Sequence, residues 1–470
     1  MREKTRPLPR ILFAAPCSGS GKTVVTCGVL ELLRRRNLTC ISFKCGPDYI
    51  DPMFHRYVLG VPGYNLDGFF LPPSEVVRLF EETTRQADIA VLEGAMGYYD
   101  GVAGITTQAS AWETADLTDS PVILVVDGKK SSLSLLALVK GFLEYEKDSH
   151  IKGVILNRTS PMMAQRLGPL LEDLGVRFLG AVPQCEEADW ESRHLGLTLP
   201  GEQRRLREKV KALADRLEPC LDLEGILELA GTAPPVVRRK FPDPCRASSA
   251  GKANTGQTRE SGAKTIRRIA VARDEAFCFY YEENLNLLRS LGWELSFFSP
   301  LHDQHLPCPG LAAIVLGGGY PEMYARELSE NHAMLEAVRT AYGQGVKILA
   351  ECGGFLYLHE TLEGADGRSY PMAGILGAAG YRTEKLSRFG YVSLYDGQGN
   401  QVARGHEFHY WDSTLPGTDL KAVKPLTTRQ WNCMYVTPRL IAGFPHLYYG
   451  FNPGWIGEFL ENTVTEDCTE

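Results

Sequence analysis

A glycine-rich stretch near the N-terminus contains the residue types that bind a phosphate chain. It reads PCSGSGKT over residues 16–23 and follows the apolar run at 11–15. In such a turn the backbone N–H groups face the phosphates, Lys22 bridges the terminal phosphates and the Thr23 hydroxyl holds Mg²⁺. Pro16 stands where the usual pattern has its first glycine, so a small-residue turn before a lysine is the alternative. The loop residues predicted to bind nucleotide are Gly19, Ser20, Gly21, Lys22 and Thr23.

Two further loops with acidic residues also follow apolar runs. One reads KCGPDYIDP at 44–52, the other reads EGAMGYYDG at 93–101, and each carries two carboxylates. Ligands of open parallel sheets gather at the carboxyl ends of the strands. Each loop alone is compatible with a solvated turn. Together with the glycine-rich loop they predict a Mg-ATP site in which Glu93 reaches the metal and an acceptor substrate lies beside it.

A second kind of chemistry is indicated by VKILAECGGFL at 346–356, an apolar strand that runs into a cysteine, two glycines and a helix. This is the layout of a nucleophile elbow, in which a helix N-terminus lowers the pKa of the thiol of Cys352. The glycine-rich segment 316–322 follows another strand and could supply backbone donors to an oxyanion. The alternative is that Cys352 is a small buried hydrophobic residue.

A thiolate nucleophile needs a base, and histidine is the usual one. His446 follows the last short apolar run and is the predicted base. Spacing alone does not separate it from His406 or His409 in GHEFHY at 405–410.

The elements that must position these residues form two alternating α/β patterns, which predict two doubly wound domains. The first pattern has strands predicted at 11–15, 39–43, 89–92, 122–126, 154–156 and 177–179, and a helix at 23–36. The second has strands predicted at 268–272, 294–298, 312–316 and 347–350, with helices at 281–291 and 333–342. The predicted organisation is a P-loop domain at 1–240, a small-residue linker at 241–265, a second α/β domain at 266–460 and a tail at 461–470.

Composition excludes several classes of protein. The chain has 470 residues, is 44% hydrophobic and carries a formal net charge of −7, which is typical of a globular protein and disfavours nucleic acid as a partner. The longest apolar runs fall short of the ~20 residues that span a membrane, and no signal peptide is recognised. Twelve cysteines without a Cys-x-x-Cys pair indicate reduced thiols. We therefore expect a soluble, cytoplasmic protein.

Nine motifs, in this order along the chain, carry a family resemblance. They are FAAPCSGSGKT, FKCGPDYIDPMFH, EGAMGYYDG, ILNR, RHLGL, RIAVARDEAFCFYYEENL, LGGGYPEMYA, AECGGFLYL and GHEFHY. The series resembles the cobyrinic acid a,c-diamide synthase family and spans nearly the whole chain. In that family an ATP-dependent synthetase domain, similar to dethiobiotin synthetase, is joined to a flavodoxin-like class I glutamine amidotransferase domain.

The resemblance implies a ligase that amidates the a and c acetate side chains of a corrinoid-type tetrapyrrole, either a cobalt corrinoid or a hydrogenobyrinic-type ring. The reaction would use two ATP, two L-glutamine and Mg²⁺, with an acyl phosphate formed from each carboxylate. A homodimer is left open as the assembly. Three alternatives also stay open: a nickel-sirohydrochlorin a,c-diamide synthase, a cobyric acid synthase, and a nucleotide-dependent binding protein with an inert amidotransferase domain.

The same resemblance implies roles for individual residues. Cys352 attacks the glutamine amide, His446 raises the nucleophilicity of the thiol, and Gly318 and Gly319 lie near the oxyanion. Asn157 lies near the adenine. The residues implied to contact the acceptor or the intermediate are Asp48, Tyr49, Ile50, Asp51 and Asp100.

The chain departs from the class I pattern at two positions. Tyr448 stands where such amidotransferases commonly have a glutamate, two residues after the histidine, and Ala350 replaces a glycine at the start of the elbow. A Cys–His dyad, or a triad completed elsewhere, is therefore expected.

Overall fold

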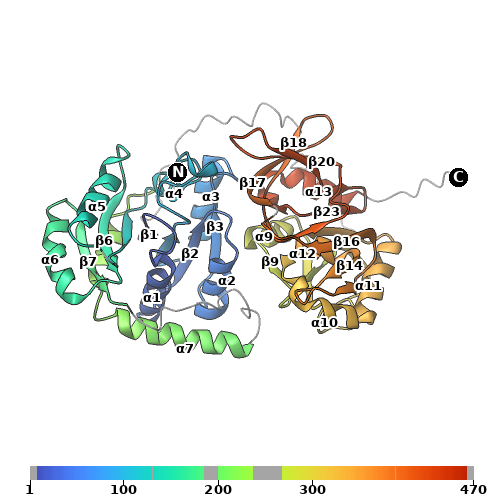
Figure 1. Cartoon of the computed structure of the whole chain (residues 1–470), viewed down its shortest axis with the longest axis horizontal. Coiled ribbons are helices and arrows are strands. Elements are labelled where there is room, and N and C mark those ends of the chain that lie inside the picture. Colours follow the sequence, from blue (N-terminus) through green and yellow to red (C-terminus); the bar gives the residue numbers. More distant parts are fainter. Residues whose placement is uncertain (1–7, 130, 185–199, 237–266, 387, 463–470) are drawn as a thin grey trace, which may run out of the picture. The chain divides into compact units, whose positions relative to one another are not determined.

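The computed structural model describes residues 8–129, 131–184, 200–236, 267–386 and 388–462 (Figure 1). The chain divides into two compact units, residues 1–238 and 239–470. The segment predicted as a linker, 241–265, and the RHLGL motif at 193–197 lie outside the described residues.

The first unit is built on a seven-stranded sheet in the order β3-β2-β4-β1-β5-β6-β7, in which all neighbouring strands are parallel. Its strands are β1 (Arg10–Ala14), β2 (Cys40–Cys45), β3 (Gly63–Leu66), β4 (Ile89–Glu93), β5 (Val122–Asp127), β6 (Ile151–Asn157) and β7 (Arg177–Val182). Strands β1, β2 and β4 are buried along their whole length, as expected when helices cover both faces of a parallel sheet. All six predicted strands are present. The edge strand β3 was not predicted.

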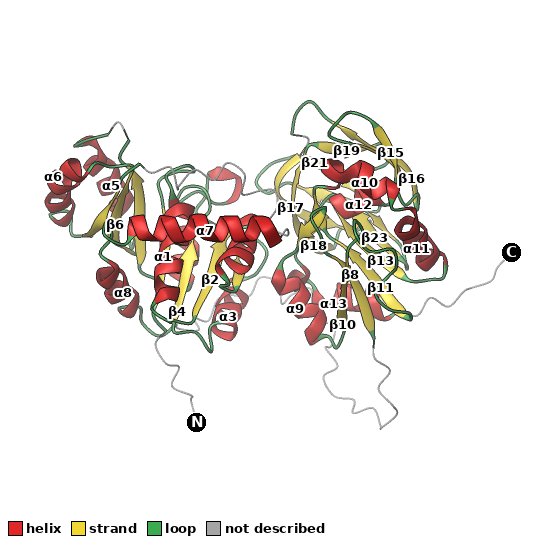
Figure 2. Ribbon diagram, turned by 90° about the horizontal axis from the view of Figure 1, so that it is seen from below, coloured by secondary structure: helices red, strands yellow, loops and turns green. Residues whose placement is uncertain are grey.

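The first helices of this unit connect consecutive strands, and the last two described helices follow β7. They are α1 (Lys22–Arg35), α2 (Ile50–Phe54), α3 (Pro73–Thr83), α4 (Ala111–Leu117), α5 (Ser134–Glu144), α6 (Pro161–Glu172), α7 (Pro200–Leu217) and α8 (Leu223–Gly231), with short helical turns η1 (His55–Leu59) and η2 (Val102–Gly104). Helix α7 packs along α1 (Figure 2). The contact is close because Gly28 has no side chain: a Cβ there would stand 2.1 Å from Leu217 Cδ1.

The second unit has a central sheet in the order β10-β8-β11-β13-β23-β22, parallel except for the edge strand β22. Its strands are β8 (Arg268–Ala272), β10 (Glu294–Phe298), β11 (Leu311–Leu316), β13 (Lys347–Glu351), β22 (Tyr435–Val436) and β23 (Leu440–Gly443). The five parallel strands have the flavodoxin-like order 2-1-3-4-5. The predicted doubly wound fold class is thus confirmed for both halves of the chain.

Three smaller sheets surround this core and were not predicted. They contain β9 (Phe277–Phe279) with β12 (Gly318–Gly319); β14 (His359–Glu363), β15 (Ser369–Pro371), β16 (Leu376–Arg382) and β19 (Trp411–Ser413); and β17 (Arg388–Tyr395), β18 (Gln401–His409), β20 (Leu420–Val423), β21 (Gln430–Cys433) and β24 (His446–Leu447).

The helices of the second unit include the two that were predicted. They are α9 (Glu282–Ser290), α10 (Ala325–Glu330), α11 (His332–Gly343), α12 (Gly353–Tyr357) and α13 (Pro453–Glu461), with turns η4 (Pro321–Tyr324) and η5 (Tyr449–Phe451). Glu461, assigned to the tail from the sequence, is the last residue of α13, and 463–470 lie outside the described residues. None of the described helices combines the length and apolar sequence that a bilayer span requires.

Strand order explains which loops meet. Strands β2, β4 and β1 are neighbours, so the loops that follow them share one edge of the first sheet. In the second unit β11, β13 and β23 are neighbours, and the segments that follow them carry the glycine pair, Cys352 and His446. Each unit therefore gathers its predicted chemistry at the carboxyl ends of adjacent parallel strands.

Candidate active sites

The glycine-rich loop joins β1 to α1 and owes its shape to residues without side chains. Gly19 has φ 79° and Gly21 has φ 95°, in the left-handed region that favours glycine. A Cβ on Gly21 would stand 2.0 Å from Asn157 Nδ2. That nitrogen donates a hydrogen bond to the Ser20 carbonyl at 2.9 Å, so the structure places Asn157 against the loop backbone.

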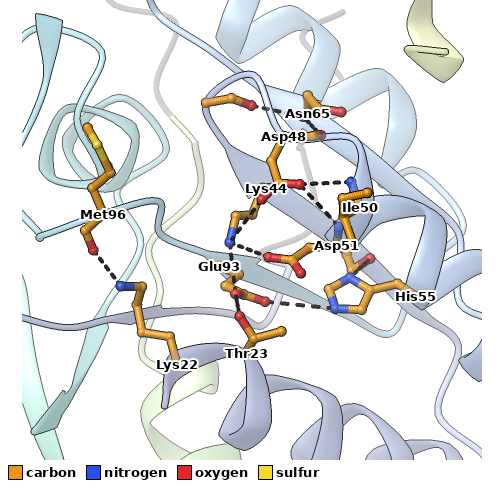
Figure 3. Close-up of polar contacts among 12 residues, drawn as sticks. Lys22, Thr23, Lys44, Asp48, Ile50, Asp51, His55, Asn65, Glu93 and Met96 are labelled. Atoms are coloured by element: carbon orange, nitrogen blue, oxygen red, sulfur yellow. Dashed lines mark hydrogen bonds and ion pairs between the residues drawn. The ribbon is translucent and has the colours of Figure 1, made fainter. Parts of the chain in front are cut away.

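Lys22 and Thr23 open helix α1 and turn toward two different neighbours (Figure 3). The Lys22 ammonium donates to the Met96 carbonyl in the loop after β4. Burial, and secondly the charge of Lys44, lowers the pKa of Lys22 to about 8. The Thr23 hydroxyl donates to Glu93 Oε1 at 2.6 Å.

A cluster of charges lies at the ends of β2 and β4 (Figure 3). Lys44 Nζ lies 2.6 Å from Asp51 Oδ2, 2.8 Å from Glu93 Oε1 and 3.8 Å from Asp48 Oδ2. Burial alone would lower the pKa of Lys44, but the ion pairs with Asp51 and Glu93 raise it well above its usual value. His55 Nε2 lies 3.8 Å from Glu93 Oε2. The cluster therefore joins Glu93, a predicted metal ligand, to two of the predicted acceptor-site residues.

The oxygens of this cluster suit Mg²⁺, which takes hard oxygen ligands and often only one or two from the protein. Glu93 is fully buried, and its Oε2 has no hydrogen-bond partner among the described residues. The Thr23 hydroxyl adjoins the same carboxylate. Within the described ranges no group of three His, Cys, Asp or Glu side chains forms a complete cage. The donor set fits an ion that completes its shell with phosphate and water.

The other predicted acceptor residues have separate environments. Asp48 Oδ1 accepts the backbone N–H groups of Ile50 at 2.8 Å and of Asp51 at 3.2 Å, which fixes the start of α2. Burial, and secondly the charge of Asp51, raises the pKa of Asp48 to about 6. Tyr49 is buried. The Asp100 carboxylate accepts the N–H of Gly97 in the loop after β4 at 2.8 Å.

In the second unit Cys352 occupies a sharp turn between β13 and α12. Its φ of 48° and ψ of −102° are rare for a residue with a side chain, as at a nucleophile elbow. The Cys352 N–H donates to the Gly443 carbonyl of β23 at 2.8 Å. This bond connects the elbow to the strand that leads to His446.

The two glycines predicted near the oxyanion lie between the elbow and the histidine. A Cβ on Gly318 would stand 2.2 Å from His446 Cε1, and a Cβ on Gly353 would stand 3.2 Å from the backbone nitrogen of Gly319. Any larger residue at Gly318 would displace the imidazole. The structure thus brings together the elbow, the glycine pair and His446.

The expected lowering of the thiol pKa is wrong for the resting structure. Burial, and secondly the charges of Glu322 and Glu407, raises the pKa of Cys352. Helix α12 has only five residues, and its N-terminus does not offset the loss of solvent. Burial, and secondly His406 and His409, lowers the pKa of His446 to about 3. Both shifts favour the neutral thiol and the neutral imidazole in the resting structure.

The competing histidines have other partners. His409 Nε2 lies 3.1 Å from Glu407 Oε2, and its ring stacks on Phe444 at a centroid distance of 4.0 Å. His406 pairs directly with His446 across strands β18 and β24. His446 therefore stays the predicted base, since it adjoins the glycine pair.

Two charged residues of these sites were missed from the sequence. Lys44 is the penultimate residue of the buried strand β2, and a lysine near the end of an apolar run was the available signal. Glu351 ends β13, and its Oε2 lies 4.0 Å from His446 Nδ1. A glutamate inside the apolar run KILAE was the signal there.

Comparison with known protein families finds a match in each half of the chain. Residues 11–197 match the CobQ/CobB/MinD/ParA nucleotide binding domain, and residues 268–447 match the CobB/CobQ-like glutamine amidotransferase domain.

Relatives match along nearly the whole chain. The cobyrinate a,c-diamide synthase of Salmonella typhimurium is 37% identical over 463 residues, which cover 96% of this chain and 97% of that protein. The proteins of that name from Caldanaerobacter subterraneus and Dehalococcoides mccartyi are 35% and 34% identical, with 96% and 98% of this chain and 97% and 99% of theirs covered. The chain therefore belongs to the cobyrinate a,c-diamide synthase family and is a glutamine-dependent, amide-forming ligase.

Proposed function

We propose that this enzyme converts the a and c acetate carboxylates of cobyrinic acid, or of hydrogenobyrinic acid, into amides in cobalamin biosynthesis. The observation that carries the proposal is the pairing, in one chain, of a phosphate loop joined to a carboxylate cluster with a cysteine elbow beside His446. The relatives' name supplies the acceptor.

The first unit would activate the carboxylate. An acetate oxygen attacks the γ-phosphorus of ATP, the bond to the β-phosphate oxygen breaks, and an acyl phosphate and ADP form. The loop N–H groups and Lys22 bind the phosphates, while Thr23 and Glu93 hold Mg²⁺. The bound ion would offset negative charge on the phosphate oxygens. Asp48, Asp51 and Asp100 position the acceptor or the intermediate.

The second unit would supply ammonia. The Cys352 sulfur attacks the side-chain amide carbon of glutamine as His446 takes the thiol proton, and the N–H groups around Gly318 and Gly319 bind the oxyanion. The C–N bond then breaks, the nitrogen takes the proton from His446, and ammonia leaves. Water hydrolyses the glutamyl thioester to glutamate and regenerates the thiol.

The two half-reactions join when ammonia attacks the acyl phosphate and displaces inorganic phosphate. Each amide therefore consumes one ATP and one glutamine, and the diamide consumes two of each. We further propose a cytoplasmic location for this chemistry, since no disulfide joins the cysteines in the described part of the chain.

The test is ATP turnover and product mass with glutamine and Mg²⁺, comparing cobyrinic acid, nickel sirohydrochlorin and no acceptor. We expect two successive amidations of cobyrinic acid with two ADP formed. Amidation of nickel sirohydrochlorin alone would instead establish the nickel enzyme. Glutamine hydrolysis with no amidated product would leave only the amidotransferase half of the proposal.

A further inference from the structure

Glu351 lies on the strand that leads to the predicted nucleophile, and this strand pairs with the one that leads to the predicted base. It is the last residue of β13, directly before Cys352, and pairs with Gly443 of β23. His446 follows Gly443 by three residues. The Glu351 side chain is 7% exposed, the His446 side chain is 3% exposed, and Glu351 Oε2 lies 4.0 Å from His446 Nδ1. The position is thus fixed by strand pairing.

The usual position for such a carboxylate is filled by an aromatic residue. Tyr448, two residues after His446, packs on Tyr281 with ring centroids 5.5 Å apart. A phenol cannot hold a full negative charge beside an imidazolium at neutral pH. If the site is to stabilise a charged histidine, the carboxylate must come from another element.

The surroundings of Glu351 leave it capacity for a further hydrogen bond. The Tyr449 hydroxyl and the Leu447 N–H hydrogen-bond to its carboxyl group. Its Oε1 is buried without a hydrogen-bond partner in the described part of the chain. A buried carboxyl oxygen without a partner is costly, which is typical of a group retained for function.

We propose that Glu351 is the third member of the glutaminase site, a positioning residue that acts through His446. When His446 takes the thiol proton, Glu351 accepts a hydrogen bond from the other ring nitrogen, fixes the ring orientation and stabilises the imidazolium. The 4.0 Å separation is longer than a hydrogen bond, and catalytic hydrogen bonds that are long without substrate commonly shorten in the complex. The inference rests on the proposed glutaminase function of the second unit.

The electrostatics of the site agree with this geometry. Burial raises the pKa of Glu351 to about 8 and lowers that of His446 to about 3, so charge on either group alone is disfavoured at rest. A carboxylate next to an imidazolium lets the two buried charges form together. The other titratable groups that face the Cys352–His446–Glu351 site come from neighbouring elements and are His406, Glu407, His409, Tyr280, Tyr449 and Glu322.

The experiment measures alkylation of Cys352 by the glutamine analogue 6-diazo-5-oxo-L-norleucine in the full-length chain, by intact mass against time. We expect Glu351→Gln to slow labelling at least about tenfold, with binding of the analogue changed less than twofold, and Glu351→Asp to recover part of the rate. Labelling of the wild type should rise through pH 8 as Glu351 ionises, and Glu351→Gln should lose this rise. Tyr448→Phe is the matched control and should stay within about twofold.

A double-mutant cycle separates positioning from a structural role. In a His446→Ala background Glu351→Gln should change the labelling rate less than about twofold, because its effect passes through the histidine. An equal loss in both backgrounds, equal losses in Glu351→Gln and Tyr448→Phe, or no loss in Glu351→Gln would overturn the inference. Failure of the wild type itself to be labelled at Cys352 would instead contradict the proposed glutaminase function.

Discussion

The two sites handle buried charge in opposite ways. In the first unit Lys44 contacts Asp51 and Glu93, so opposite charges offset one another at the resting site. In the second unit the thiol, the imidazole and the Glu351 carboxyl have their pKa values shifted toward the neutral forms. A site that binds phosphates and a metal needs permanent charge. A site that makes a thiolate needs charge only during the reaction. In each unit the charges of the resting site therefore match the chemistry proposed for it.

The largest expected effect is the loss of glutamine-dependent amidation when Cys352 is replaced, and it separates the activities of the two sites. Cys352→Ala should lower glutamine-dependent amidation by at least about 1,000-fold, because the nucleophile is lost. With ammonium chloride as nitrogen donor, the same variant should keep its amidation rate, since the first unit is unchanged. Product mass under both conditions is the measurement. Equal loss with both donors would contradict two separable sites.

Removing the cation of the first site should destabilise it. Lys44→Met leaves Asp51 and Glu93 as buried carboxylates without their cation, so the free energy of unfolding should fall by about 3 to 5 kcal/mol at pH 7. Urea unfolding measures this, with Lys140→Met as control. Lys140 is exposed and pairs with Glu144 at 3.7 Å, so its loss should cost less than about 0.5 kcal/mol. Equal costs at both lysines would contradict the role of Lys44 as the cation that offsets the buried carboxylates.

Glu93 tests whether the charged site serves phosphoryl transfer. Glu93→Gln removes the charge but keeps the size, and should lower amidation with either glutamine or ammonium chloride by about 100-fold. Raising the Mg²⁺ concentration should recover part of that loss. Unchanged ATP turnover would exclude Glu93 from the metal site, and a loss confined to the glutamine-dependent reaction would place its effect in the other unit.

Neutralising Glu351 in the second site should raise the stability of the protein, whereas removing the charge of Lys44 in the first site should lower it. The folded pKa of Glu351, about 8, lies above its ordinary value of 4.5, so its contribution to stability is present at low pH and is lost between pH 4.5 and 8. Glu351→Gln should match the wild type at pH 5 and be more stable at pH 9 by about 1 to 3 kcal/mol. Thermal unfolding at the two pH values checks this. A variant that is less stable at pH 9 would contradict the buried, uncompensated state of Glu351.

Sequence periodicity predicted the central sheets because their strands are long, apolar runs such as Val122–Asp127. It missed β3, whose four residues include a glycine and an asparagine. It also missed the three smaller sheets, in which several strands have only two or three residues. Local motifs predicted Lys22, Glu93 and Cys352 because a turn type and a strand end specify them. Glu351 and Lys44 were not predicted because their roles depend on which strands are neighbours in the sheet. The direction of the Cys352 pKa shift depends on burial, which no local motif records.

Our central claim is that each new amide nitrogen comes from the side chain of glutamine: the second unit releases it as ammonia, and the first unit adds it to the activated carboxylate. The most direct measurement is product mass after reaction with glutamine labelled by ¹⁵N at the side-chain amide, in the presence of ATP, Mg²⁺ and cobyrinic acid. We predict a diamide in which both new nitrogens carry the label, with one ADP formed for each. Labelled ammonia and glutamate released without label in the tetrapyrrole would contradict the account.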